Sequence, residues 1–81
     1  MPELSLTLYS TWGCHLCDEA VALLQQQNVQ FQQLDIVDDP VAFARFRSSI
    51  PVLGSAESFL YWPFDQAAVA AFVQELSSQG K

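Results

Sequence analysis

Apolar and polar residues alternate from Leu4 to Tyr9, and this period of two predicts a β-strand. From Cys14 the pattern changes, because the apolar positions 17, 20, 21 and 24 recur at i, i+3, i+4 and i+7. We therefore expect a helix over about His15–Gln27. Val29–Val37 predicts a second strand, but glutamines at positions 30, 32 and 33 make it too polar for the centre of a sheet. We place this second strand at a sheet edge.

The second half of the chain predicts two further helices and a hairpin. Asp39 before Pro40 is typical of a helix start, and the short helix that follows should end at residues 47–49, before Pro51. The runs 51–54 and 58–62 are separated by a small polar turn and predict the hairpin. Asp65 should cap a last helix with core positions 69, 72, 73 and 76, followed by a polar tail over 77–81. Four aromatic side chains are expected in the core: Phe43, Phe46, Tyr61 and Phe64.

The resulting order of elements, β-α-β-α-β-β-α, predicts the fold class. A helix joins the first two strands, so they should be parallel, whereas the hairpin strands should be antiparallel. We expect an α/β fold in a single domain over residues 1–81, with one four-stranded mixed sheet and helices packed on it.

Composition and charge exclude several classes of protein. Hydrophobic residues make up 51% of the chain and charged residues 15%, which excludes intrinsic disorder. The net charge of −6 argues against nucleic acid and anionic membranes, because binding phosphate requires clustered Lys and Arg. The longest apolar run, Ala67–Val73, is too short to span a bilayer, and no basic segment of a signal peptide precedes Leu4. We therefore expect a cytoplasmic protein.

The two cysteines form the motif Cys14-His15-Leu16-Cys17 at the start of the first helix, which indicates redox or metal chemistry. A spacing of three puts both side chains on one face of the helix, roughly 5–6 Å apart, a separation that a disulfide can bridge. Free backbone N–H groups and the helix dipole stabilise a thiolate there, and the thiolate is the form that attacks disulfides. Cys14, further out, is the predicted nucleophile, and Cys17, on the apolar stripe, is the predicted resolving thiol.

Charged neighbours of this motif act in opposite directions. His15 is a candidate modulator of the thiolate and of the reduction potential, since its protonated form would favour the charged sulfur. Asp18 and Glu19 suit the helix dipole, but their negative charge disfavours a nearby thiolate.

Other interpretations of the cysteine pair remain open. A purely structural disulfide would close a very small loop and contribute little stability. Two reduced cysteines can also serve as small core residues. Zinc or an iron–sulfur cluster needs more ligands than Cys14, Cys17 and one histidine supply, so such a site would have to bridge two chains. A non-enzymatic module that binds a partner through its aromatic side chains is a further alternative.

Three segments, 6–10, 13–20 and 50–53, resemble a glutaredoxin-like protein of the thioredoxin-fold superfamily. The order of elements is also similar over nearly the whole chain. The resemblance implies a thioredoxin/glutaredoxin-like fold with a cis peptide bond before Pro51, and with Pro51 beside Cys14. It also implies that the backbone of Ile50 pairs with a bound peptide or with glutathione.

The chain departs from the glutaredoxin pattern where glutathione would bind. The basic residue that usually precedes the first cysteine is missing from residues 10–13, and Trp62-Pro63-Phe64 replaces a Gly-Gly pair before Asp65. Arg45 and Arg47 are the remaining candidates for contact with a ligand carboxylate. The candidate substrate-binding residues are Trp12, Gly13, Ile50, Pro51 and Asp65, with Trp12 in an apolar rim.

The sequence therefore predicts a small thiol–disulfide oxidoreductase that acts on disulfide-containing proteins or peptides and uses glutathione weakly. We expect a monomer with no required cofactor and no metal, with glutathione as a candidate reductant.

Overall fold

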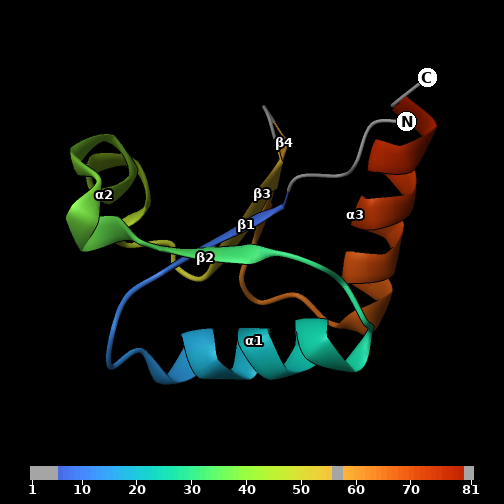
Figure 1. Ribbon diagram of the computed structural model, residues 1–81, viewed down its shortest axis with the longest axis horizontal. Coiled ribbons are helices and arrows are strands. Elements are labelled where there is room, and N and C mark those ends of the chain that lie inside the picture. Colours follow the sequence, from blue (N-terminus) through green and yellow to red (C-terminus); the bar gives the residue numbers. More distant parts are fainter. Residues whose placement is uncertain (1–5, 56–57, 80–81) are drawn as a thin grey trace.

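Figure 1 shows the computed structural model of the protein, which describes residues 6–55 and 58–79. The strands are β1 (Thr7–Ser10), β2 (Gln32–Asp35), β3 (Val52–Ser55) and β4 (Ser58–Tyr61). The helices are α1 (His15–Gln26), α2 (Pro40–Phe46) and α3 (Gln66–Gln79), and a single 3-10 turn, η1 (Ile36–Asp38), lies between β2 and α2. None of the helices within these described residues is long and apolar enough to cross a membrane.

The four strands form one mixed sheet in the order β2-β1-β3-β4. β1 pairs in parallel with β2 and antiparallel with β3, and β3 pairs antiparallel with β4. The predicted mixed sheet and hairpin are confirmed. The predicted edge position of the glutamine-rich strand is confirmed as well, since β2 has one neighbour and its first two residues are exposed.

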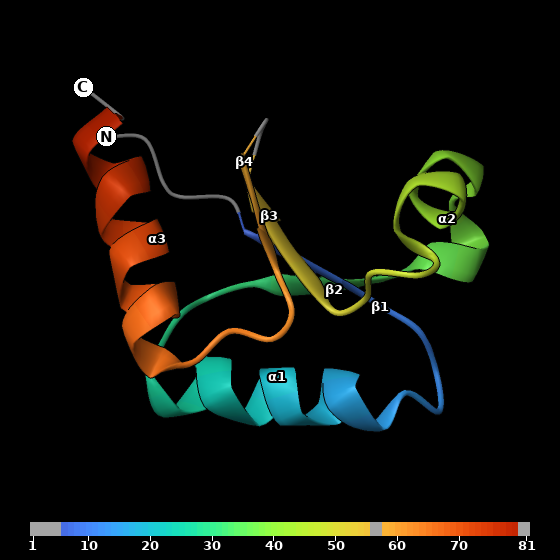
Figure 2. The same cartoon turned by 180° about the vertical axis from the view of Figure 1, so that it is seen from behind.

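Helices cover both faces of the sheet (Figures 1 and 2). Successive strand residues point to opposite faces, so Leu8 packs with α1 and α3, whereas Tyr9 packs with α2. The larger cluster contains Leu24 of α1 and Val69 of α3, both fully buried. The smaller cluster, on the α2 face, centres on Phe46. The strands β1, β3 and β4 therefore contribute side chains to both clusters, whereas β2 contributes Leu34 to the α2-face cluster alone.

Local signals at the helix starts are confirmed by hydrogen bonds. The Asp39 carboxylate accepts from the backbone N–H groups of Val41 and Ala42, at 3.0 and 3.2 Å. The Asp65 carboxylate accepts from the N–H of Ala68 at 2.8 Å. Each carboxylate satisfies N–H groups that have no partner within the helix.

The prediction of a core position is wrong for two aromatic residues, Phe43 and Tyr61. Phe43 is 40% exposed, because the short α2 packs along one line only, through Ala42 and Phe46. Tyr61 is 48% exposed, because it ends the edge strand β4. Phe46 and Phe64 are buried as predicted.

Several element boundaries also differ from the prediction. The second strand is shorter than 29–37, because the Asp35 carboxylate accepts from the N–H of Val37 at 3.1 Å and turns the chain into η1. The predicted polar tail is wrong for residues 77–79, which continue α3, while residues 80–81 lie outside the described residues. Residues 4–5 of the predicted first strand also lie outside them.

Candidate redox site

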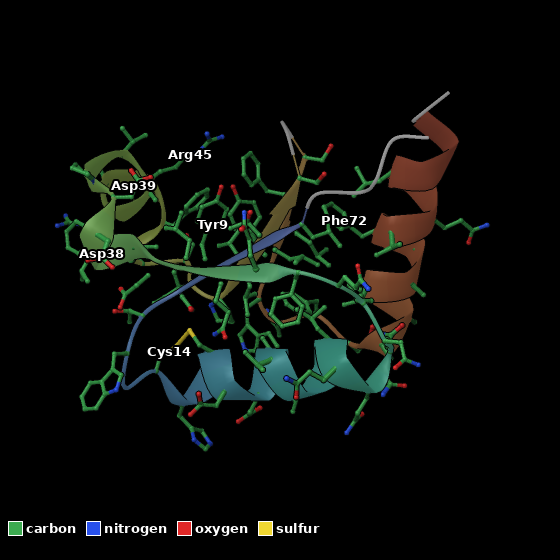
Figure 3. All side chains as sticks on the ribbon, viewed as in Figure 1. Tyr9, Cys14, Asp38, Asp39, Arg45 and Phe72 are labelled. Carbon is green, nitrogen blue, oxygen red and sulfur yellow. A yellow bond between two sulfur atoms is a disulfide. The ribbon has the colours of Figure 1, made fainter. Side chains whose placement is uncertain are left out.

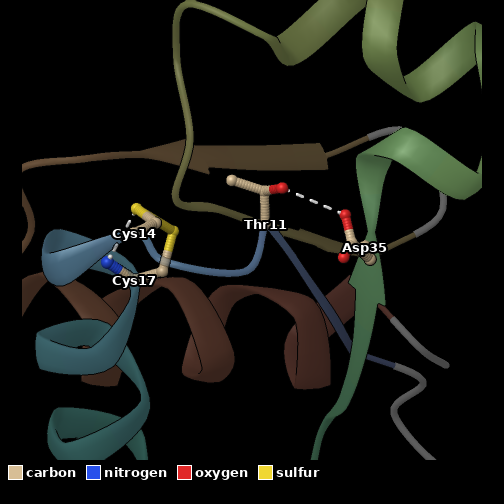
Figure 4. The surroundings of a disulfide bond; sticks show 4 residues. All are labelled: Thr11, Cys14, Cys17 and Asp35. Carbon is tan, nitrogen blue, oxygen red and sulfur yellow. Dashed lines mark hydrogen bonds between the residues drawn. A yellow bond between two sulfur atoms is a disulfide. The ribbon is translucent and has the colours of Figure 1, made fainter.

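Cys14 and Cys17 form a disulfide at the start of α1 (Figure 4). Their Cα atoms are 5.2 Å apart, within the range that a disulfide spans. Cys14 is the N-cap residue, with extended backbone angles, and its Sγ accepts a hydrogen bond from the N–H of Cys17 at 3.2 Å. The sulfur thus occupies the place that a serine or aspartate oxygen takes at most helix starts.

The two sulfurs differ in exposure. Cys17 is 3% exposed and belongs to the buried residues of α1, whereas Cys14 is partly exposed. A reagent from solution therefore reaches Cys14 more readily than Cys17. This difference is what an attacking and a resolving thiol require.

The loop before Cys14 is fixed by two features that the motif does not reveal. Gly13 has a φ of +81°, a left-handed conformation that favours glycine. The Thr11 hydroxyl donates to the Asp35 carboxylate at 3.1 Å, as Figure 4 shows in the surroundings of the disulfide. The same carboxylate oxygen accepts from Val37, so Asp35 connects the cysteine loop to the end of β2.

Thr11 and Asp35 were not among the predicted site residues, although the sequence contains a signal for them. β1 and β2 are parallel, and Ser10 lies opposite Asp35 in their register. The carboxyl ends of neighbouring parallel strands meet at one sheet edge. Polar residues that follow the first strand and end the second were therefore candidates for a shared site.

His15 contacts a carboxylate rather than a sulfur. Its Nε2 lies 3.2 Å from Glu19 Oε2, and the two side chains are 86% and 50% exposed. An exposed contact of this kind, one helical turn apart, contributes little to stability.

A family model described as Glutaredoxin-like domain (DUF836) matches residues 5–74. The chain belongs to this glutaredoxin-like family. The chain is similar to the protein XcR50 from X. campestris, whose X-ray structure it matches with 36% identity and a TM-score of 0.78. The match covers 86% of this chain and 96% of that chain. Protein Ne2328 from Nitrosomonas europaea, at 22% identity, shares the fold with a TM-score of 0.74 over 89% of this chain and 93% of that one. A search of curated proteins gave no match.

Within this glutaredoxin-like domain, the residues proposed for substrate binding have different surroundings. Trp12 is 92% exposed in the loop before the cysteines. The Ile50–Pro51 peptide bond is cis, and so is Trp62–Pro63, which the sequence did not indicate. The Ile50 side chain packs against the core cluster on the α2 face. Asp65 caps α3 through its carboxylate.

The arginines of the glutaredoxin-like domain lie on α2 or at its end. The Arg45 guanidinium lies over the ring of Phe59, 4.5 Å from its centroid, and over Phe46 at 5.4 Å. Figure 3 shows Arg45 at the opposite side of the sheet from Cys14. Arg47 is exposed at the C-terminal end of α2. Arg45 therefore stabilises an aromatic cluster and does not supply a positive charge beside the cysteines.

Metal ligation is the alternative chemistry that a Cys-x-x-Cys motif can support. Among the residues that the structure describes, no three or more His, Cys, Asp or Glu side chains are grouped as metal ligands. The Cys14–Cys17 pair, at disulfide distance, fits a Cys-x-x-Cys redox site.

Proposed function

We propose that this glutaredoxin-like protein is a thiol–disulfide oxidoreductase in which Cys14 is the nucleophile and Cys17 the resolving thiol. The observation that supports the proposal most is the asymmetry of the disulfide. Cys14 is partly exposed at the N-cap of α1, while Cys17 is 3% exposed directly behind it. The Cys17 N–H that donates to Cys14 Sγ also favours a negative charge on that sulfur.

The reaction begins with the reduced pair. The Cys14 thiolate attacks one sulfur of a substrate disulfide, forms a mixed disulfide and releases the other substrate sulfur as a thiolate. The Cys17 thiolate then attacks Cys14 Sγ, which forms the Cys14–Cys17 disulfide and releases the second substrate thiolate. Two electrons pass from the protein to the substrate, and the released thiolates take up protons. A thiol reductant, with glutathione as one candidate, returns the pair to the dithiol.

Glutathione is proposed as a weak substrate. The loop of residues 10–13 contains no basic residue, and the glycine pair before Asp65 is replaced. Arg45, a candidate for holding a carboxylate, lies over aromatic rings on the α2 face. A disulfide of a protein or peptide fits this site better, and we propose that the protein acts on it as a cytoplasmic monomer.

Trapping the mixed disulfide tests the proposal. Reduced Cys17→Ser protein, incubated with a peptide disulfide, should accumulate a mixed disulfide through Cys14, because the thiol that resolves it is absent. Intact-mass measurement should show one peptide per chain. Cys14→Ser, the matched control, retains only the buried sulfur and should form at least about tenfold less adduct.

Two results would contradict the proposal. Equal adduct on both variants would show that Cys14 has no privileged reactivity. A metal-containing dimer purified without oxygen, with no adduct on either variant, would favour the interpretation as a site that bridges two chains.

A further inference from the structure

A hollow on the surface adjoins the cysteine loop. Trp12 and Gly13 line it from the loop, Asp18 from the first turn of α1, and Gln33 and Asp35 from β2. Gly13 directly precedes Cys14, and the N–H of Asp18 donates to the carbonyl oxygen of Cys14 at 3.2 Å. A group bound in this hollow would therefore lie beside residues that flank Cys14 in the structure.

The charge in the hollow has one sign. Asp18 and Asp35 both line it, and no basic side chain of the described residues does. The Asp35 carboxylate already accepts two hydrogen bonds, from Thr11 and Val37, but both donors are neutral and leave its charge uncompensated. Clefts lined by charges of one sign concentrate ligands of the opposite sign and repel ligands of the same sign.

Trp12 adds an aromatic surface to the same hollow. Its side chain is 92% exposed, so its ring is available to a ligand. The face of an indole attracts ammonium and guanidinium groups within about 6 Å of its centroid. Carboxylates beside an exposed indole thus complement the alkyl stem and the charged end of lysine or arginine.

We propose that this hollow binds a lysine or arginine side chain adjacent to the disulfide of a protein or peptide substrate. The inference rests on the proposed exchange reaction and specifies its substrate class. It also gives a physical reason for weak use of glutathione, since the carboxylates of glutathione would meet Asp18 and Asp35.

The test compares three peptide disulfides that are identical except for the residue next to cysteine, which is Lys, Gln or Glu. The rate at which the reduced wild-type protein reduces each peptide is divided by the rate with dithiothreitol, which corrects for the reactivity of the disulfide itself. The Lys peptide should be reduced about tenfold faster than the Gln peptide at low ionic strength, and the Glu peptide more slowly. The Lys preference should fall as salt shortens the screening length from about 10 Å at 0.1 M to about 3 Å at 1 M.

Variants identify the source of the preference. Asp35→Asn, which keeps an acceptor oxygen for Thr11, and Asp18→Asn each remove one charge, and each should lower the Lys-to-Gln rate ratio several-fold. Trp12→Leu, which keeps an apolar side chain but removes the aromatic face, should lower the ratio as well. Glu75→Gln removes a charge from the exposed surface of α3 and is the matched control, which should retain the wild-type ratio.

The outcomes separate this inference from the proposed function. Equal reduction of all three peptides would overturn the inference and leave the oxidoreductase intact. An equal loss of preference in the control would also overturn it, because net charge alone would then explain the rates. Reduction of none of the peptides would overturn the proposed function and the inference with it.

Discussion

Replacing Gly54 with alanine should destabilise the protein, because β3 passes close to two aromatic rings at this residue. A Cβ on Gly54 would lie 2.9 Å from Phe59 Cδ1, 3.0 Å from Phe59 Cε1 and 3.0 Å from Tyr9 Cε2. Non-bonded carbon atoms pack best at about 3.5–4.0 Å, so the added methyl would be too close to three ring atoms by about 0.5 Å or more.

The rings have little room to move. The ring of Tyr9 packs 4.7 Å from Phe46, and Phe46 packs 5.4 Å from Phe59, measured between centroids. The Arg45 guanidinium lies 4.5 Å from the centroid of Phe59. Overpacking of this kind lowers the free energy of unfolding by about 1–3 kcal/mol. For a domain of this size, even the lower value lowers Tm by about 4 °C or more.

Urea unfolding, followed by far-UV circular dichroism, measures the effect. In the Gly54→Ala background, Phe59→Ala should cost less than it costs in the wild type, because it removes both Phe59 ring atoms that the methyl meets and leaves only the contact with Tyr9. We expect a coupling energy of at least about 0.5 kcal/mol between the two changes. A wild-type urea midpoint for Gly54→Ala, or strict additivity in the double variant, would refute this account of the packing.

Three further predictions concern the loops and helix starts around the site. Gly13→Ala should lower the free energy of unfolding by about 1–2 kcal/mol in urea, because its φ of +81° disfavours a Cβ; an unchanged midpoint would contradict this. Asp39→Ala should cost about 1 kcal/mol through loss of the α2 cap, whereas Asp38→Ala, the exposed neighbour, should change stability by less than about 0.5 kcal/mol; equal losses would rule out capping as the cause. Thr11→Val removes the hydrogen bond to Asp35 and should speed amide hydrogen exchange in residues 11–13; exchange at the wild-type rate would show that this bond does not hold the loop.

Much of the fold follows from signals within short stretches of the chain. Local features predicted the helices correctly. The helical period runs from Cys17 to Leu24 in α1, and capping carboxylates begin α2 and α3 at Asp39 and Asp65. The edge position of β2 was predictable as well, because exposed glutamines are incompatible with a strand buried on both faces.

What could not be predicted depends on contacts between distant segments. The exposure of Phe43 and Tyr61 is set by where the neighbouring elements end, and neither residue type nor spacing reveals that. Nothing in the sequence distinguishes Gly54 from any other glycine in a strand. The rings of Phe59 and Tyr9, which pack close to its Cα in the structure, show why a side chain does not fit there.

The same contrast between local signals and contacts of distant segments applies to the candidate site. The Cys14–Cys17 pair was predictable, because its spacing and its helix start are local. The hollow beside it combines Trp12 and Asp35, which are brought to one sheet edge by the parallel pairing of β1 and β2. That register is set by tertiary structure, so the hollow could be anticipated only from the acidic balance, the lack of a basic loop residue and the polar residues at the two strand ends.

The proposed function requires that Cys14 and Cys17 form a reversible redox couple. The most direct measurement equilibrates the wild-type protein over a series of thiol–disulfide buffers, traps free thiols by alkylation and counts them by mass. A dithiol–disulfide couple should show a single transition from two free thiols to none, with the two-electron slope of about 30 mV per tenfold change in equilibrium constant. Two free thiols at every buffer potential would contradict it.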